Sequence, residues 1–497
     1  MHVGPSSNEH MRMQLGGALK SITVEECRQL VCRAAMALAC TIVYACAAAS
    51  QSNTVVAERA DQSKLPITVN AGDSVLRFDW PDLQIGTGEY EDGPTGVTVI
   101  HFKHPALAAV DVRGGSPGTV DTDFLRLGYE TPELDAIVFS GGSTYGLESV
   151  TAVNSALKDD GVRDSNWNNV AFSTGAIIYD FGDRRLNEIY PDKRLAQAAL
   201  RAERAGVFAL GEHGAGRSAL SGGIFGCNAH SGQGAAYRMI GEVKVAAFVV
   251  VNSWGVVTTR DGHLASCNLD SAWPKAITVA DLVAGLVRDL EAGVPTPWLA
   301  GAGNSRHNTT ISLIVISKKV APSDLQRLAV QVHQSMARAI QPFATRYDGD
   351  VLYAVSTEEY VAPLPEPPFA DAALGVAAAE TMWDAILASV PDAPLPPRFS
   401  DHSIAASADV KRFVGDYVFS PIARLRISSE GDNLFAEATG SRRIYAIHVG
   451  ARTQLQPISG TEFGISGRYP LVLSFEQSGR LIVNPGPWQQ VGLRQGR

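Results

Sequence analysis

The sequence feature that most constrains the fold is a set of continuous apolar runs. Residues 136–140 and 245–251 contain no alternation of apolar and polar positions, which is typical of strands buried on both faces. A third run, Ile311 to Ile316, follows a polar hinge at Arg306 to Thr310. The sequence therefore predicts strands that lie inside a large domain.

Other segments predict the elements around these strands. β-branched residues over 97–102 indicate one strand, and alternation from residue 108 indicates a second strand that enters a glycine turn at 114–115. Apolar spacing, glycines and prolines predict helices over 147–158, 193–205, 277–291 and 371–390. A capping box over 323–326 predicts the start of a further helix.

The polar hinge offers a nucleophile of an unusual kind. If the bond between Asn308 and Thr309 is cut, Thr309 carries a hydroxyl and its own α-amine. The pKa of a free α-amino group is about 8, which suits a general base near neutral pH. The hydroxyl of Thr309 would first attack the carbonyl of Asn308, and water would open the resulting ester.

Four other polar residues suit the same chemistry. Asn252 ends a buried strand and Tyr145 lies in a glycine turn, so both are candidate oxyanion donors. Asp348 and Asp350 are two positions apart on an extended segment and point to the same face. Two carboxylates this close raise the pKa of one of them unless a cation lies between them, and the α-ammonium of Thr309 is a candidate.

Each of these features has a simpler interpretation on its own. Asn308-Thr309-Thr310 is also a glycosylation sequon, and Asp348-Gly349-Asp350 is also a turn sequence. Asn252 could cap a turn, and Tyr145 could be a core aromatic. Their occurrence together and in order favours the catalytic interpretation.

Several motifs together resemble one family of hydrolases, the DmpA-type L-aminopeptidase/D-amidase/D-esterase family, over roughly residues 80–390. The matching segments are residues 95–99, 110–119, 139–147, 214–216, 251–252 and 307–311. The resemblance implies a precursor that cleaves itself and folds as a four-layer αββα sandwich of the N-terminal-nucleophile type. It also implies Thr309 as nucleophile, Asn252 and Tyr145 as oxyanion and positioning groups, and Asp348 with Asp350 as the acidic pair.

The resemblance carries further expectations about substrate and assembly. A Thr nucleophile with two Asp is closest to the nylon-oligomer hydrolase branch, and family precedent implies a homo-oligomer of cleaved protomers. Relatives usually show a Lys before a glycine-rich turn where this chain has His230. A contact of His230 with substrate and a structural role for it remain equally open.

The N-terminal segment indicates export. A basic segment, an apolar segment and small residues predict a signal peptide over 1–50, followed by a linker over 51–65. A lipoprotein processing site at Cys46 is the alternative, so a lipid anchor is the one membrane contact expected. In an oxidising compartment Cys227 and Cys267 could form a disulfide or remain buried thiols.

The C-terminal part predicts a second domain. The prolines at 391, 394, 396 and 397 indicate a linker over 391–409 after a hydrolase domain over 66–390. Beyond it, short alternating segments over 410–497 predict an accessory all-β domain, which resembles the small β domain appended to secreted β-lactamase-like hydrolases.

Charge and motifs exclude several functions. The formal net charge is -9 and no long basic run is present, so we expect a small peptide or amide as substrate and no nucleic acid. Residues 211–218 lack the Lys of a phosphate-binding loop, residues 141–145 lack the final Gly of a nucleophile elbow, and no metal motif or cofactor is expected. The open alternatives are an endo-hydrolase of ω-amino-acid oligomers, an acyltransferase of the ornithine acetyltransferase type and an uncleaved exported binding protein.

Overall fold

The structure of the chain is a computed structural model, which describes residues 61–129, 133–165, 168–181, 185–227, 229–267, 277–294, 308–363, 367–390, 410–465, 471–486 and 488–495. The predicted signal peptide, most of the first linker and the proline-rich linker lie outside the described residues. Within the described part, no helix is both long enough and apolar enough to cross a membrane.

The hydrolase domain is built on a sheet of 11 strands among the described residues. Along the main path the strands are β12 (Gln233–Ile240), β13 (Val243–Asn252), β15 (Thr309–Lys318), β17 (Val351–Tyr360), β4 (Thr95–Val112), β6 (Glu133–Ser140), β7 (Ser173–Ile177) and β5 (Thr119–Val120). Off this path, β3 (Leu83–Tyr90) pairs with β4, and β1 (Thr68–Val69) and β8 (Arg204–Ala205) pair with β3.

Strand β4 belongs to both halves of this sheet. Its first part pairs with β3 and β6, and its last part, from Leu107, pairs with β17. The prediction of two separate strands here was wrong, because the exposed residues Lys103 to Pro105 interrupt the apolar pattern without ending the strand. The register shifts between His101 and Ala106, and this irregularity accommodates the proline.

The apolar runs are buried on both faces, as predicted. In β13, Phe248 belongs to a cluster that faces β6 and β3, whereas its neighbour Val249 belongs to a second cluster under the helices. Successive residues of a strand point to opposite faces. Leu313 and Ile314 of β15 divide between the same two clusters.

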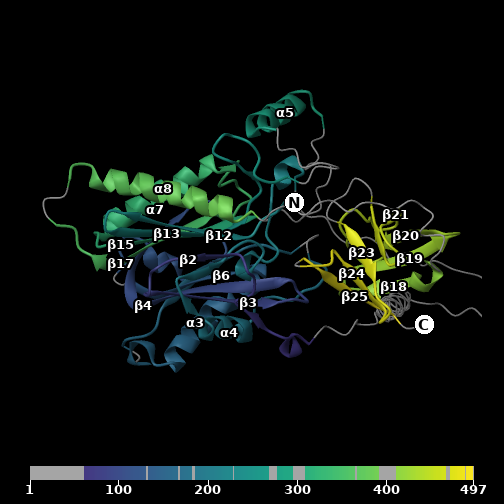
Figure 1. The fold of residues 1–497 in the computed structure, drawn as a ribbon, viewed down its shortest axis with the longest axis horizontal. Coiled ribbons are helices and arrows are strands. Elements are labelled where there is room, and N and C mark those ends of the chain that lie inside the picture. The colour runs from purple at the N-terminus through teal and green to yellow at the C-terminus, as the bar shows by residue number, and fades with distance from the viewer. Residues whose placement is uncertain are drawn as a thin grey trace, which may run out of the picture. The chain divides into compact units, whose positions relative to one another are not determined.

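Helices cover the outer faces of the sheet. Helix α8 (Ala370–Ala388) packs on β12 and β13, and helix α7 (Pro322–Ser335) packs on β17 and β4, through the second cluster (Figure 1). Helices α3 (Glu148–Asp159) and α4 (Lys193–Arg201) pack on β3, β4 and β6 through a further cluster. The first cluster lies between the two halves of the sheet.

Two helix termini differ from the sequence prediction. Helix α7 begins at Pro322 after the N-cap Ala321, without the predicted capping box, because proline suits the first turn. Helix α4 ends at Arg201 rather than at residue 205, because Arg204 and Ala205 pair with β3. Helix α5 (Val279–Glu291) does begin with a capping box, between Thr278 and Asp281.

Short elements complete the described part of this domain. They comprise α2 (Ser143–Gly146), the strand pairs β2 (Val75–Arg77) with β9 (Val207–Ala209), β10 (Leu220–Ser221) with β11 (Ala229–His230) and β14 (Val256–Val257) with β16 (Ile340–Gln341), and the 3-10 turns Gln62–Lys64, Thr122–Leu125, Val162–Ser165, Gly214–Gly216, Gly223–Phe225 and Met336–Arg338. A disulfide joins Cys227 and Cys267 within a small apolar cluster.

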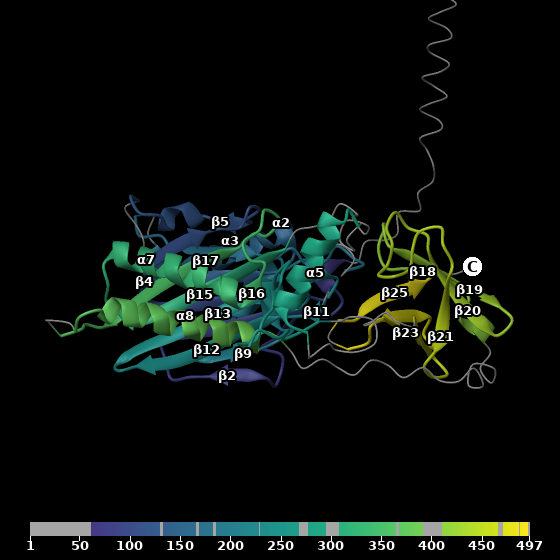
Figure 2. The ribbon, with the colours of Figure 1, turned by 90° about the horizontal axis from the view of Figure 1, so that it is seen from above.

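The C-terminal residues form a closed β-barrel. After a 3-10 turn at Val410–Phe413, its strands are β18 (Gly415–Val418), β19 (Arg424–Glu430), β20 (Asn433–Ala438), β21 (Thr453–Pro457), β22 (Glu462–Gly464), β23 (Val472–Phe475), β24 (Arg480–Val483) and β25 (Gln490–Arg494) (Figure 2). The all-β prediction agrees with this, and Ile444 and Ile447 form an isolated bridge outside the named strands. Closure occurs where β25 pairs with β18.

Candidate active site

The candidate site lies where three neighbouring strands of the sheet begin or end. Thr309 opens β15 and pairs with Asn252, the last residue of β13. On the other side, Ile311 of β15 pairs with Val351, the first residue of β17. Asp348 and Asp350 directly precede β17, so the register brings both aspartates beside the Asn308-Thr309 bond.

The geometry at this bond is tightly defined. The hydroxyl of Thr309 donates a hydrogen bond to the carbonyl oxygen of Asn308 at 2.6 Å. The same carbonyl accepts a hydrogen bond from the backbone N–H of Gly349 at 2.8 Å. The Asn308 carbonyl is therefore polarised by a backbone donor while the hydroxyl lies beside it.

Gly349 makes room for this arrangement. A Cβ at this position would lie 2.8 Å from Oγ1 of Thr309 and 2.6 Å from the carbonyl oxygen of Ser116. Contacts this short are not tolerated, and the Ser116 carbonyl is backbone that cannot easily move away. The central Gly of the Asp-Gly-Asp sequence thus has a specific steric role at the hydroxyl.

Asp350 is completely buried and held by backbone donors. One carboxylate oxygen accepts from Thr310 N at 2.6 Å and the other from Ala344 N at 2.9 Å. Burial, together with the nearby charge of Asp348, raises the pKa of Asp350 to about 8. The acid is therefore largely protonated at neutral pH while the Asn308-Thr309 bond is intact.

Asp348 is buried beside it. Its carboxylate accepts from the backbone N–H of Trp254 at 3.1 Å and from the Thr345 hydroxyl at 2.5 Å. Burial raises the pKa of Asp348 above its ordinary value, while these hydrogen bonds oppose the shift. A positive charge formed nearby would favour the ionised form of both carboxylates.

The side chain of Asn252 connects strand β10 with the segment that follows β7. Its carbonyl oxygen accepts from Leu220 N at 3.1 Å, and its amide nitrogen donates to the carbonyl oxygen of Tyr179 at 3.0 Å. The residue is fully buried next to Thr309. The structure thus brings Asn252, Thr309 and the two aspartates together, and the roles assigned to them stay predictions.

Tyr145 stands apart from this group. It lies on the short helix α2, its side chain is 63% exposed, and its ring packs near those of Phe181 at 6.1 Å and Tyr190 at 5.6 Å. Its oxyanion role stays a prediction.

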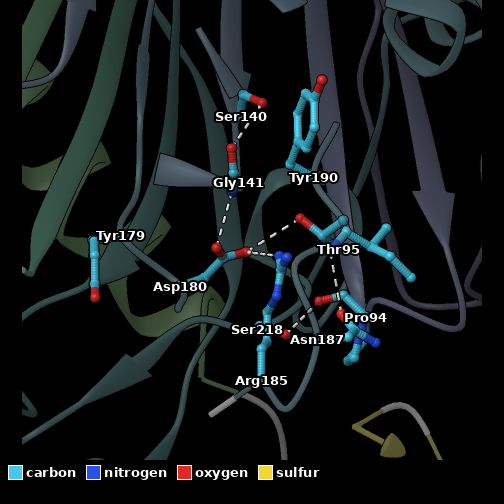
Figure 3. Close-up of polar contacts among 12 residues, drawn as sticks. Pro94, Thr95, Ser140, Gly141, Tyr179, Asp180, Arg185, Asn187, Tyr190 and Ser218 are labelled. Atoms are coloured by element: carbon cyan, nitrogen blue, oxygen red, sulfur yellow. Dashed lines mark hydrogen bonds and ion pairs between the residues drawn. The ribbon is translucent and has the colours of Figure 1, made fainter. Parts of the chain in front are cut away.

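The sequence analysis missed a buried polar cluster centred on Asp180. Its carboxylate accepts hydrogen bonds from Gly142 N at 2.9 Å, from the Thr95 hydroxyl at 3.2 Å and from the Arg185 guanidinium at 3.0 Å (Figure 3). Asp180 follows β7, a strand that the sequence analysis did not identify. A lone acid in an irregular segment gives no periodic signal.

The glycine-rich segment at 211–218 has an internal partner. Arg217 forms an ion pair with the buried Glu89, and Gly214 N donates to the same carboxylate at 2.8 Å. These donors therefore bind a carboxylate of the protein itself. In the described part of the chain, no cluster of three or more His, Cys, Asp or Glu residues is arranged to hold a metal ion.

His230 lies close to the site through the backbone. It belongs to β11 and pairs with Leu220, whose N–H binds Asn252. A contact of its ring with substrate and a structural role both stay predictions.

Comparisons with known proteins agree with the resemblance in the sequence. The model of peptidase family S58 matches residues 77–395. The chain is 39% identical to a 6-aminohexanoate-oligomer endohydrolase of Kocuria sp. (strain KY2) over 328 residues, 64% of this chain and 86% of that protein. It is 33% identical to an uncharacterised aminopeptidase of Mycobacterium tuberculosis (strain ATCC 25618 / H37Rv) over 325 residues, 62% of this chain and 88% of that protein.

Solved structures give weaker similarity. A Burkholderia sp. β-aminopeptidase aligns with a TM-score of 0.44 and 22% identity, covering 64% of this chain and 87% of that chain. The L-aminopeptidase D-Ala-esterase/amidase of Ochrobactrum anthropi aligns with a TM-score of 0.45 and 18% identity, covering 65% and 88%. The family model extends over more than half of the chain, and the expected family is confirmed. The chain belongs to peptidase family S58 and is a hydrolase of that family.

Proposed function

We propose that the chain is an exported amidase that cleaves itself between Asn308 and Thr309 and then hydrolyses small peptides or amino-acid amides with Thr309. The observation that carries the proposal is the position of the Thr309 hydroxyl, 2.6 Å from the carbonyl oxygen of the preceding residue and next to two buried aspartates. A self-cleaving, four-layer αββα domain of the N-terminal-nucleophile type is part of the same proposal.

In the proposed self-cleavage, Oγ1 of Thr309 attacks the carbonyl carbon of Asn308. The Gly349 N–H, which already donates to that carbonyl oxygen at 2.8 Å, stabilises the developing oxyanion. The C–N bond breaks, the α-amine of Thr309 takes up a proton, and water hydrolyses the ester. The products are a carboxylate on Asn308 and a free N-terminal Thr309.

The aspartates act on the amine that results. An α-ammonium at Thr309 supplies the positive charge that the buried pair lacks in the uncut chain, so the pKa values of Asp348 and Asp350 fall when cleavage occurs. The neutral amine then accepts the proton of the Thr309 hydroxyl when it attacks a substrate amide. Asn252 and Tyr145 are the proposed donors to the substrate carbonyl.

The same site supports a second substrate class. The chain is more similar to the 6-aminohexanoate-oligomer endohydrolase of Kocuria sp., at 39% identity, than to the mycobacterial aminopeptidase, at 33%. This difference favours oligomers of ω-amino acids as the alternative substrate. Assays of amides of L-, D-, β- and ω-amino acids separate the two substrate classes. The same assays with and without an acyl acceptor separate hydrolysis from acyl transfer.

Substitution of Thr309 tests the proposed function. The purified wild-type chain should give two fragments on a denaturing gel, the smaller with Thr309 as its first residue. Thr309→Ala should remain one chain and lose at least ~10³-fold of its amidase activity, because both reactions need the hydroxyl. Thr310→Ala is the matched control and should still cleave before residue 309.

Two results would contradict the proposal. One is an uncut wild-type chain with full amidase activity, and the other is an active Thr309→Ala variant. A chain that is neither cut nor active on any amide would favour the exported binding protein.

Export and assembly are further parts of the proposal. The Cys227–Cys267 disulfide supports an oxidising compartment, because structural disulfides are rare in the cytosol. Size-exclusion chromatography of the cleaved protein measures whether it forms the proposed homo-oligomer.

A further inference from the structure

Two consecutive residues after β7 connect the two proposed carbonyl-binding groups. The backbone carbonyl of Tyr179 accepts from the Asn252 side chain at 3.0 Å. The carboxylate of Asp180 accepts from Gly142 N at 2.9 Å. Gly142 is the N-cap of the helix that carries Tyr145. The Tyr179-Asp180 segment therefore bridges Asn252 and Tyr145.

We propose that Asp180 is a positioning residue of the active site. Its carboxylate, held by Arg185, fixes the turn at Gly141 and Gly142 and thereby sets the position of Tyr145 relative to Asn252. This inference rests on the proposed function, in which Tyr145 and Asn252 contact the substrate carbonyl.

The turn itself depends on this anchor. Gly142 has a positive φ of 80°, and α2 has no side-chain hydrogen bond at its N-cap. A Cβ on Gly141 would lie 2.6 Å from Oδ2 of Asp180, so the carboxylate is packed directly against the turn. Without the carboxylate, Gly142 N loses the acceptor that the described structure provides.

Arg185 provides a second route to Tyr145. Its guanidinium carbon lies 4.4 Å from the centre of the Phe181 ring, and that ring meets the ring of Tyr145 at an interplanar angle of 80°. The ion pair between Asp180 and Arg185 thus supports Tyr145 through the backbone of its helix and through an aromatic neighbour.

The burial of the pair determines how it can be tested. The side chains of Arg185 and Asp180 are 0% and 1% exposed. Among the described residues, Nε and Nη2 of Arg185 have no hydrogen-bond partner, so its charge depends on Asp180. Removal of Asp180 alone would leave a buried, uncompensated cation and could unfold the protein. Both charges must therefore be removed together.

The experiment compares two double variants that differ in whether residue 180 offers a side-chain oxygen to Gly142 N and to the Thr95 hydroxyl. Asp180→Asn with Arg185→Met removes both charges and keeps an amide oxygen that can accept from Gly142 N. Asp180→Ala with Arg185→Met removes the charges and the acceptor. We expect the kcat for amide hydrolysis to be at least ~10-fold lower in the Ala variant than in the Asn variant, with KM changed less than about 3-fold, because misplacement of a catalytic group acts mainly on the transition state.

A matched control separates positioning from general destabilisation. Asp135 is also a buried acid paired with an arginine, Arg163, and it lies near the opposite end of β6 from Gly141. Asp135→Ala with Arg163→Met should lower the thermal midpoint and leave the kcat of the cleaved enzyme within about 2-fold of wild type, because effects on stability and on the site are separate. A Tyr145→Phe background should also abolish the difference between the two Asp180 variants.

The outcomes are distinct. Equal kcat values in the two Asp180 variants, or an equal loss in the Asp135 control, would overturn the positioning role. An active Thr309→Ala variant would instead overturn the proposed function, whatever the Asp180 variants do.

Discussion

At the scale of single residues, the Asn308-Thr309 bond lies beside a buried carboxyl group whose pKa is raised. Asp350 has a pKa raised to about 8 by burial and by the charge of Asp348, yet both of its oxygens accept backbone hydrogen bonds. In the uncut chain, burial thus favours the neutral, protonated form of Asp350. In the proposed mechanism, cleavage creates an ammonium group at Thr309, and this positive charge favours the ionised carboxylate.

This predicts a pH dependence of stability in the uncut chain. The pKa of Asp350 is about 8 when folded, against about 3.9 in an unfolded chain. The folded state therefore binds the proton more tightly, so its stabilisation is complete below about pH 4 and is lost as the pH rises through about 8. Urea unfolding of Thr309→Ala should show decreasing stability from pH 4 to pH 8.

Thr309→Ala with Asp350→Asn is the control for this measurement. Asn does not titrate, so its curve should fall less steeply over the same range. If stability falls equally with pH in the two variants, the pH dependence does not come from Asp350.

At the scale of elements, the sequence predicted what has a strong local pattern. The apolar runs of β6, β13 and β15 and the positions of helices α3 and α8 were predicted correctly. The short strand β7, Ser173–Ile177, was missed because its Ser, Thr and Gly residues have no apolar alternation. With β7 missed, Asp180 could not be placed, although it binds the turn of Tyr145.

The residues of the candidate site also have a local sequence pattern, whereas their contacts do not. The pairing of Asn252 with Thr309 depends on the register of β13 and β15, which single-strand patterns do not contain. The motifs nevertheless named both residues, since strand ends are where polar groups follow apolar runs. Contacts made through backbone atoms, such as Trp254 N to Asp348, have no sequence signature.

The disulfide gives a prediction at the same scale. Cys227 and Cys267 are 40 residues apart and close a loop that contains β11, β12, β13 and β14. In the loop-entropy model such a crosslink stabilises the folded state by about 4 kcal/mol. Cys227→Ser with Cys267→Ser should lower the free energy of unfolding by that order, measured with urea.

A reducing agent should lower the stability of the wild type and leave the double Ser variant unchanged. A wild type that is insensitive to full reduction would contradict a stabilising role for this crosslink.

At the scale of the whole molecule, the family match ends before the barrel. It covers residues 77–395, whereas the barrel strands run from Gly415 to Arg494. The barrel is closed by the pairing of β18 with β25 and encloses its own apolar cluster, which includes Leu425, Leu473 and Leu481. A closed barrel has no free edge strand.

We therefore expect residues 410–497 to fold when produced alone. Circular dichroism should show β structure and one cooperative thermal transition, because this segment contains the closed sheet and all residues of its buried core except Leu186. The same fragment with Leu473→Ala, which removes a fully buried side chain, should unfold about 10 °C or more lower. A fragment without a cooperative transition would contradict this independence.

The pairing of β15 with its neighbours has a consequence for the number of chains. β13 and β4 lie before residue 308, whereas β15 and β17 lie after it, and β15 and β17 are hydrogen-bonded to β13 and β4 respectively. A cut at Asn308-Thr309 therefore divides the sheet between two polypeptides without removing a ladder hydrogen bond. Folding of the uncut precursor is a first-order process, independent of concentration. Once the chain is cut, the same fold is a heterodimer, and its reassembly from two unfolded polypeptides is a second-order process. Cleavage therefore changes the molecularity of folding but does not change the architecture.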